Sequence, residues 1–212
     1  VASTKAFTAM VLCLSALAVM IARQRGVIDA AGERARLDLL STVPRLMAET
    51  IALEPQIEAL AREISEAGDA LFLGRGLMYP LALEGALKLK EITYMHAEGY
   101  AAGEIKHGPI ALVDETTPVI ALAPHDALFD KLASNMREVI GRKGRVAMIG
   151  DADACAEMSG EVWRSVTLPR ADPLVAPFLY AVAVQFIAYH AALAKGTDVD
   201  QPRNLAKSVT VE

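Results

Sequence analysis

The chain has 212 residues, of which 53% are apolar and 22% are charged, and its formal net charge is -5. This composition predicts a compact globular protein with a sizeable core and excludes an intrinsically disordered chain. The acidic balance argues against a nucleic-acid-binding surface and favours an enzyme that handles small molecules. Cys13 and Cys155 lie far apart and form neither a disulfide framework nor a zinc motif. We therefore expect a reducing, cytoplasmic setting.

The first predicted element is a helix around the apolar run of residues 7–22. Ser3 and Thr4 are candidate N-caps, and Gly26 is a candidate end. The run is shorter than the roughly 20 residues that a membrane span needs, and basic residues flank it. We favour a buried core helix over the two alternatives, a membrane span and a signal peptide. Because no Met begins the chain, we expect that Val1 is not the natural start of the polypeptide.

Residues 30–66 repeat apolar side chains at helical spacing, which predicts further helix. Pro44 and Pro55 interrupt this pattern, since proline breaks or kinks a helix interior. Two or three helices are therefore expected here.

From residue 68 the pattern changes to short apolar runs that alternate with helical stretches. Alternation of strand and helix predicts an α/β fold, in which helices flank a parallel sheet of four or five strands on both faces. The predicted strands lie within residues 69–76, 117–124, 144–151 and 162–169, and the predicted helices span 78–95, 126–142 and 173–194. We divide the chain into a helical part at 1–66, an α/β domain at 67–195 and an extended tail at 196–212.

One face of the predicted helix 78–95 carries Glu84, Lys88 and Glu91 at positions i, i+4 and i+7. By spacing alone, a solvated stripe with ion pairs is the favoured interpretation. Two features favour a site instead. The neighbouring residues are small, as Gly85 is, which permits close approach of another element. The stripe also leads directly into a second charged cluster.

That second cluster is HAEGYAAGEIKHGP at residues 96–109, which we interpret as a polar turn. A histidine held in a Gly-Pro turn is often structural, but His107 is also a candidate for proton transfer near neutral pH. The spacing of His and Glu matches no metal motif, so no metal is expected. The GRG at 74–76 is a weak phosphate-loop signal, for which plain turn chemistry is favoured.

The tail carries Lys207 between small and apolar residues. A tail lysine is usually solvated. If it docks and loses hydration, its amine becomes a nucleophile toward a carbonyl.

Three segments together resemble the C-terminal part of the glutamine–fructose-6-phosphate aminotransferase (glucosamine-6-phosphate synthase) family. They are VASTKAFT, FLGRGLMYPLALEGALKLKEITYMHAEGYAAGEIKHGP and KGTDVDQPRNLAKSVTVE. The resemblance implies the helical end of a first sugar isomerase (SIS) domain and a complete second one, built on a five-stranded parallel sheet. In that family a glutaminase domain normally precedes these two domains in the same chain, and it is absent from this sequence. The resemblance also implies a cytoplasmic homodimer and no metal or organic cofactor. Nucleic-acid and membrane partners are not expected.

The same resemblance implies conversion of fructose 6-phosphate and glutamine-derived ammonia to glucosamine 6-phosphate. It assigns ring opening to His107, donated by the neighbouring subunit, and proton transfer between C1 and C2 to Glu91. It assigns a Schiff base with the open-chain sugar to Lys207. Lys88 and Glu84 are implied as supporting residues.

Val1, Ser3 and Ala206 match positions that line the sugar site in that family. The Ser/Thr-rich phosphate loop of the family is not in this sequence. Two alternatives are a stand-alone SIS isomerase and a non-catalytic SIS sensor of sugar phosphates. The presence of Glu91, His107 and Lys207 together argues against the sensor, because a sensor needs neither a base nor a Schiff-base lysine.

Overall fold

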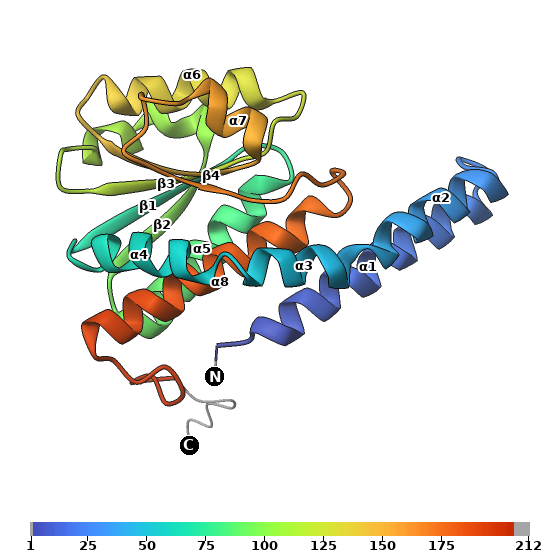
Figure 1. Cartoon of the computed structure of the whole chain (residues 1–212), viewed down its shortest axis with the longest axis horizontal. Helices are drawn as coiled ribbons and strands as arrows, with labels where there is room; N and C mark the ends of the chain where they lie inside the picture. The colour runs from blue at the N-terminus through green and yellow to red at the C-terminus, as the bar shows by residue number, and fades with distance from the viewer. Residues whose placement is uncertain (1, 206–212) are drawn as a thin grey trace.

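A computed structural model describes residues 2–205 of the chain. Five strands form one sheet in the order β2-β1-β3-β4-β5, and every neighbouring pair is parallel. Helices lie on both faces of this sheet (Figure 1). The predicted parallel α/β architecture is therefore confirmed. The strands are β1 (Asp69–Gly74), β2 (His96–Ala101), β3 (Pro118–Ala123), β4 (Arg145–Gly150) and β5 (Arg164–Thr167).

Strand β1 is the point at which the chain changes the side on which it adds strands to the sheet. The chain passes from β1 to β2 on one side and then returns to place β3, β4 and β5 on the other side. Every residue of β3 is buried, which explains its continuous apolar sequence, since a central parallel strand is covered on both faces. In open α/β sheets such a reversal opens a crevice at the carboxyl ends of the strands.

The sequence interpretation of residues 96–101 as part of a polar turn was wrong, because this segment is strand β2. It pairs with β1 in register from Asp69 with His96 to Gly74 with Ala101. β2 lies at the edge of the sheet, where most of its side chains are only partly covered. An edge strand of this kind tolerates charged residues and glycine, so its sequence carries no continuous apolar run.

One face of the sheet is covered by α4 (Glu54–Ser65), α5 (Met78–Thr93) and α8 (Ala176–Lys195). Helix α8 is apolar around most of its circumference because it is buried at the centre of this layer. The opposite face is covered mainly by α6 (Phe129–Ile140), with the 3₁₀ helix η1 (Ala102–His107) and the short helix α7 (Ala152–Glu157). A second 3₁₀ helix, η2 (Pro109–Leu112), follows η1.

Three helices lie in the region where two or three were predicted, namely α2 (Ala30–Ser41), α3 (Val43–Ile51) and α4. Pro44 and Pro55 stand in the first turns of α3 and α4. Proline is tolerated there because the missing N–H has no partner within the helix. Both helices pack against α8.

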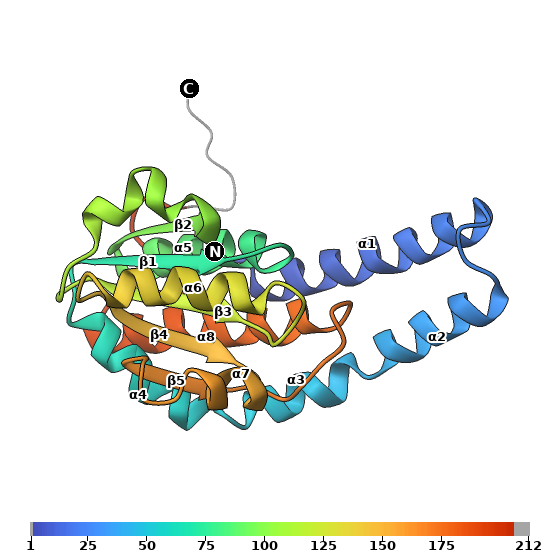
Figure 2. The same ribbon diagram turned by 90° about the horizontal axis from the view of Figure 1, so that it is seen from above.

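The prediction of a buried core helix at the N-terminus was wrong. Helix α1 (Thr4–Gln24) has one buried residue, Val19, and projects from the sheet together with α2 (Figure 2). Ser3 occupies the N-cap position without a side-chain hydrogen bond, and Gly26 follows the helix end at φ 70°. Six large apolar side chains of α1 are exposed: Met10, Leu12, Leu14, Leu17, Met20 and Ile21.

Within residues 2–205, α1 and α8 are long and apolar enough to cross a membrane by length and composition alone. Most of α8 is buried inside the protein, which accounts for its apolar character as a core helix. Helix α1 is exposed and has no such cover among residues 2–205.

Candidate active site

Glu84, Lys88 and Glu91 form a compact charged row on helix α5. The ammonium Nζ of Lys88 lies 2.5 Å from Oε2 of Glu91 and 3.9 Å from Oε1 of Glu84. Only 6% of the Lys88 side chain is exposed, against 11% for Glu84 and 22% for Glu91. The row is therefore not the solvated stripe that spacing alone favoured. A lysine buried to this degree requires its carboxylate partners.

Small residues explain how α5 carries this row so deep in the protein. A Cβ atom on Gly85 would lie 2.7 Å from the Phe72 ring and 3.1 Å from Val184. The helix therefore approaches β1 and α8 more closely than a larger side chain would allow. Close packing withdraws the middle of α5 from solvent, and Lys88 with it.

Burial also alters the titration of Glu84. Desolvation raises the pKa of Glu84 above its ordinary value, and the nearby Glu91 charge raises it further. The Lys88 ammonium opposes this shift in the pKa of Glu84 but does not cancel it. The row thus combines a carboxyl group that favours its proton with the Lys88–Glu91 ion pair. Two carboxyl groups in different environments around one cation are suited to proton transfer.

The tail begins beside the end of α5 that carries Glu91. The hydroxyl Oγ1 of Thr197 lies 2.6 Å from the carbonyl oxygen of Ile92 and 3.1 Å from that of Ala192. This contact joins the C-terminal ends of α5 and α8. The predicted Lys207 and Ala206 follow this segment and, like Val1, lie outside the described residues.

The structure does not bring His107 to the charged row of its own chain. His107 ends η1, which follows the carboxyl end of β2 and packs with α6 on one face of the sheet. Helix α5 packs with α8 on the other face, and Glu91 lies near its C-terminal end. Ser3, at the N-cap of α1, is exposed. His107 and Glu91 are therefore not brought together within one copy of the chain.

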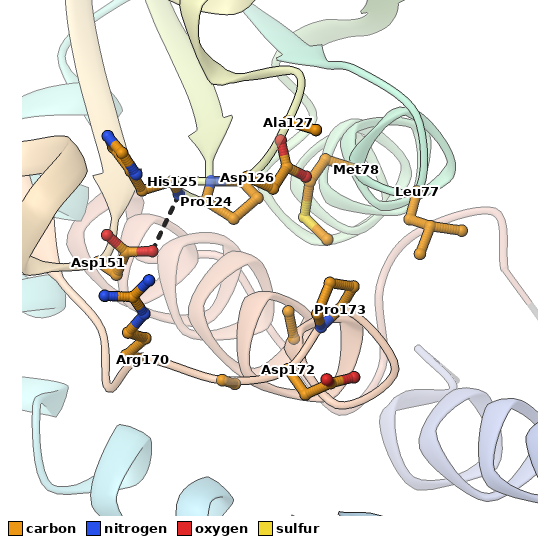
Figure 3. A pocket seen from close by; sticks show the side chains of 12 residues that line it. Leu77, Met78, Pro124, His125, Asp126, Ala127, Asp151, Arg170, Asp172 and Pro173 are labelled. Carbon is orange, nitrogen blue, oxygen red and sulfur yellow. Dashed lines mark hydrogen bonds between the residues drawn. The ribbon is translucent and has the colours of Figure 1, made fainter. Parts of the chain in front are cut away.

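A cavity of about 510 Å³, which the sequence interpretation missed, opens at the carboxyl ends of the strands. Its lining comes from the segments that follow β1, β3, β4 and β5 (Figure 3). The Asp151 carboxylate accepts hydrogen bonds from the backbone N–H of His125 at 2.9 Å and from that of Ala154 at 3.1 Å. Asp126 and Asp172 likewise accept from backbone N–H groups two residues ahead.

These carboxylates stabilise the loops that form the cavity. For Asp126 and Asp151, the available sequence signal was their place at the end of predicted strand regions, in APHD and MIGD. Across residues 2–205, no group of three or more His, Cys, Asp or Glu side chains is placed to hold a metal ion.

The doubly wound sheet and the charged row on α5 define an α/β sandwich with ionisable residues withdrawn from solvent on one helix. A sequence model described as the SIS domain matches residues 63–195, which is more than half of the chain. The chain belongs to the SIS domain family.

Relatives named glutamine–fructose-6-phosphate aminotransferase (isomerizing) resemble the whole chain. Those from Rhizobium meliloti and Caulobacter vibrioides are 54% and 56% identical, and each alignment covers 100% of this chain and 35% of the relative. The chain thus spans about a third of their length. The resemblance noted in the sequence is confirmed.

Two solved structures also match the fold of this chain. The C-terminal domain of glucosamine-fructose-6-phosphate aminotransferase from Francisella tularensis superposes with a TM-score of 0.90 at 38% identity, covering 94% of this chain and 56% of that one. A phosphosugar isomerase structure from Silicibacter pomeroyi superposes with a TM-score of 0.63 at 27% identity, covering 78% and 48%.

Proposed function

We propose that this chain is the isomerase region of a glutamine–fructose-6-phosphate aminotransferase, which makes glucosamine 6-phosphate from fructose 6-phosphate and glutamine-derived ammonia. The observation that carries the proposal is the buried row of Glu84, Lys88 and Glu91 in a chain more than half identical to relatives of that name. The glutaminase domain that releases the ammonia belongs to the part of the relatives that this chain does not span.

In the proposed reaction, His107 of a neighbouring subunit transfers the protons that open the sugar ring. The C2 carbonyl then condenses with the Lys207 amine, and water leaves. Ammonia displaces the lysine at C2 and leaves an imine there. The Glu91 carboxylate removes a proton from C1 and returns one to C2. The C1 hydroxyl loses its proton and the imine nitrogen gains one, which gives an aldehyde at C1 and an amine at C2. No metal or organic cofactor enters these steps.

The charged row suits the last step for a physical reason. The Lys88 ammonium, 2.5 Å from Oε2 of Glu91, donates a charge-assisted hydrogen bond to the carboxylate that is the proposed base. Because Lys88 is itself buried, its position is fixed and the carboxylate is held in one orientation.

A homodimer in the cytoplasm is part of the same proposal. The separation of His107 and Glu91 on opposite faces of the sheet supports a shared site, since each chain then supplies what the other lacks. We also propose that residues 1–66 complete a first SIS domain and that residues 196–212 return to the active site. Val1, Ser3 and Ala206 would contact the sugar.

Helix α1 supports the assignment of its region to an incomplete domain. Leu14 is 64% exposed on a helix with one buried residue. Such a long apolar face is expected to be covered by the rest of the polypeptide. Leu14→Asp in the full-length protein should then lower the thermal midpoint. An unchanged midpoint would show that α1 stays uncovered.

The decisive experiment supplies the full-length protein that carries this chain with fructose 6-phosphate and glutamine. Glucosamine 6-phosphate and glutamate should appear in equal amounts. If glucose 6-phosphate forms without ammonia and no amino sugar appears, the protein is a stand-alone isomerase. Binding of fructose 6-phosphate without any product would indicate a sensor.

A further inference from the structure

Helix α5 ends in an unusual way at Tyr94. This residue is the C-cap and adopts the left-handed conformation, with φ 62° and ψ 14°. Glycine is the usual residue at such a place, because a side chain is disfavoured at positive φ. Contacts made by the Tyr94 side chain must offset this backbone preference.

Those contacts are made to one residue of the tail, Arg203. The phenol oxygen of Tyr94 accepts a hydrogen bond of 2.9 Å from the backbone N–H of Arg203. The Arg203 guanidinium also lies over the Tyr94 ring, with its central carbon 4.1 Å from the ring centroid. Tyr94 therefore holds both the backbone and the side chain of the same residue. We call this pair the tail clasp.

The segment between α8 and the tail clasp is also fixed in place. Thr197 is bonded to the carbonyl of Ile92, and Asp198 accepts hydrogen bonds of 2.9 Å from the backbone N–H groups of Asp200 and Gln201. Pro202 is buried directly before the clasp. The tail is thus attached at two points, and both are at the last turn of α5.

We propose that Tyr94 is a positioning residue that brings the tail to the charged row. Glu91 lies three residues before Tyr94, and Lys207 lies four residues after Arg203. Thr197 and the tail clasp therefore fasten residues 197–203, which precede Lys207 in the sequence, to the helix end that carries Glu91. This inference rests on the proposed function, in which Lys207 forms the Schiff base.

The first measurement follows the tail itself, in the full-length protein. Trypsin cleavage after the exposed Arg203 reports how often the tail leaves the clasp. Tyr94→Leu, which removes both contacts, should speed this cleavage about tenfold, and Tyr94→Phe, which keeps the ring, should have a smaller effect. Tyr79→Leu is the matched control, because Tyr79 is an exposed tyrosine near the start of the same helix. The rate of cleavage after Arg203 in Tyr79→Leu should equal that in the wild type.

The second measurement follows the formation of the Schiff base and the turnover of fructose 6-phosphate. Borohydride in the presence of fructose 6-phosphate should trap the sugar on Lys207 in the wild type. Tyr94→Leu should lower the trapping yield and kcat by about tenfold, with KM changed less than twofold, because positioning affects the reacting state more than ground-state binding. Tyr94→Phe should recover part of both losses.

The outcomes separate this inference from the proposed function. If the wild type gives no adduct, the Schiff-base function is wrong, while cleavage after Arg203 still decides whether Tyr94 holds the tail. Cleavage of Tyr94→Leu at the wild-type rate overturns the tail clasp. Faster cleavage with unchanged trapping and turnover overturns the positioning role, since the tail would then be held for stability alone. If Tyr94→Leu does not fold, the same criteria apply to Tyr94→Phe.

Discussion

The ammonium of Lys88 lies 2.5 Å from the carboxylate of Glu91, one helical turn away on α5, and it is almost completely withdrawn from solvent. Pairs of this spacing on a helix surface contribute little to stability. Here burial changes the balance, because the Lys88 ammonium has lost its hydration and depends on its carboxylate partners. The pair therefore fixes the geometry of the proposed base.

Replacing Glu91 with Gln should leave the fold intact and reduce amino-sugar formation at least about 100-fold, the usual contribution of a general base. The amide has the shape of the carboxyl group but cannot take up the C1 proton. Turnover of fructose 6-phosphate and glutamine measures the effect, and circular dichroism checks the fold. Wild-type turnover in this variant would remove Glu91 from the mechanism.

A mixture of two inactive full-length variants, Glu91→Gln and His107→Asn, should regain activity if the site is shared between subunits. Random exchange makes half of the dimers mixed, and each mixed dimer has one intact site, so about a quarter of wild-type activity is expected. Assays before and after subunit exchange give the result. No recovery, despite exchange shown by mass spectrometry, would place both residues in one subunit or outside the reaction.

Lys88→Met should destabilise the protein by about 3 kcal/mol, because it leaves two carboxyl groups without their buried cation. Chemical unfolding of wild type and variant provides the measurement. Lys90→Met is the matched control, since Lys90 is exposed on the same helix, and its effect should be within about 0.5 kcal/mol. The double variant with Lys88→Met and Glu84→Gln should regain part of the lost free energy of unfolding. A loss equal to that of the control would show that the pair contributes nothing.

The raised pKa of Glu84 predicts a particular pH dependence. Between the ordinary pKa of 4.5 and the raised value, the folded protein holds a proton on Glu84 that the unfolded chain has released. The stabilising contribution of this group is therefore complete below pH 4.5 and is lost as pH rises through the raised pKa. The thermal midpoint of Glu84→Gln minus that of the wild type should increase across this range. A difference that stays constant with pH would contradict the shift.

Gly74→Ala should destabilise the fold by about 3 kcal/mol, in the range of severe overpacking. A Cβ atom at Gly74 would lie 2.1 Å from the backbone oxygen of Met78, so the junction of β1 and α5 would have to move. Gly68→Ala is the control, because nothing lies within 4 Å of its Cβ position. Chemical unfolding compares the two variants, and equal stability would mean that the junction adapts without cost.

Much of this fold could be predicted from local pattern. Strands β1, β3 and β4 were recognised by their continuous apolar sequences, β5 by a weaker run, and the long helices α5, α6 and α8 by their helical pattern, because buried parallel strands and helices have distinct periodicities. The short helix α7 was missed. Strand β2 was missed, since an edge strand lacks the apolar run. The burial of helix α1 was predicted wrongly. Its apolar composition is that of a core helix, but composition does not report whether another element covers the helix.

For the candidate site, the sequence by itself determined which residues share one helical face, because the spacing of Glu84, Lys88 and Glu91 follows from the geometry of the α-helix. It also determined the family, through long motifs around those residues. Only the tertiary structure decided that the row is buried, since this depends on the close approach of α5 to β1 and α8. It alone placed Arg203 on Tyr94 and set His107 on the opposite face of the sheet. These relationships join residues far apart in the chain, and no local periodicity encodes them.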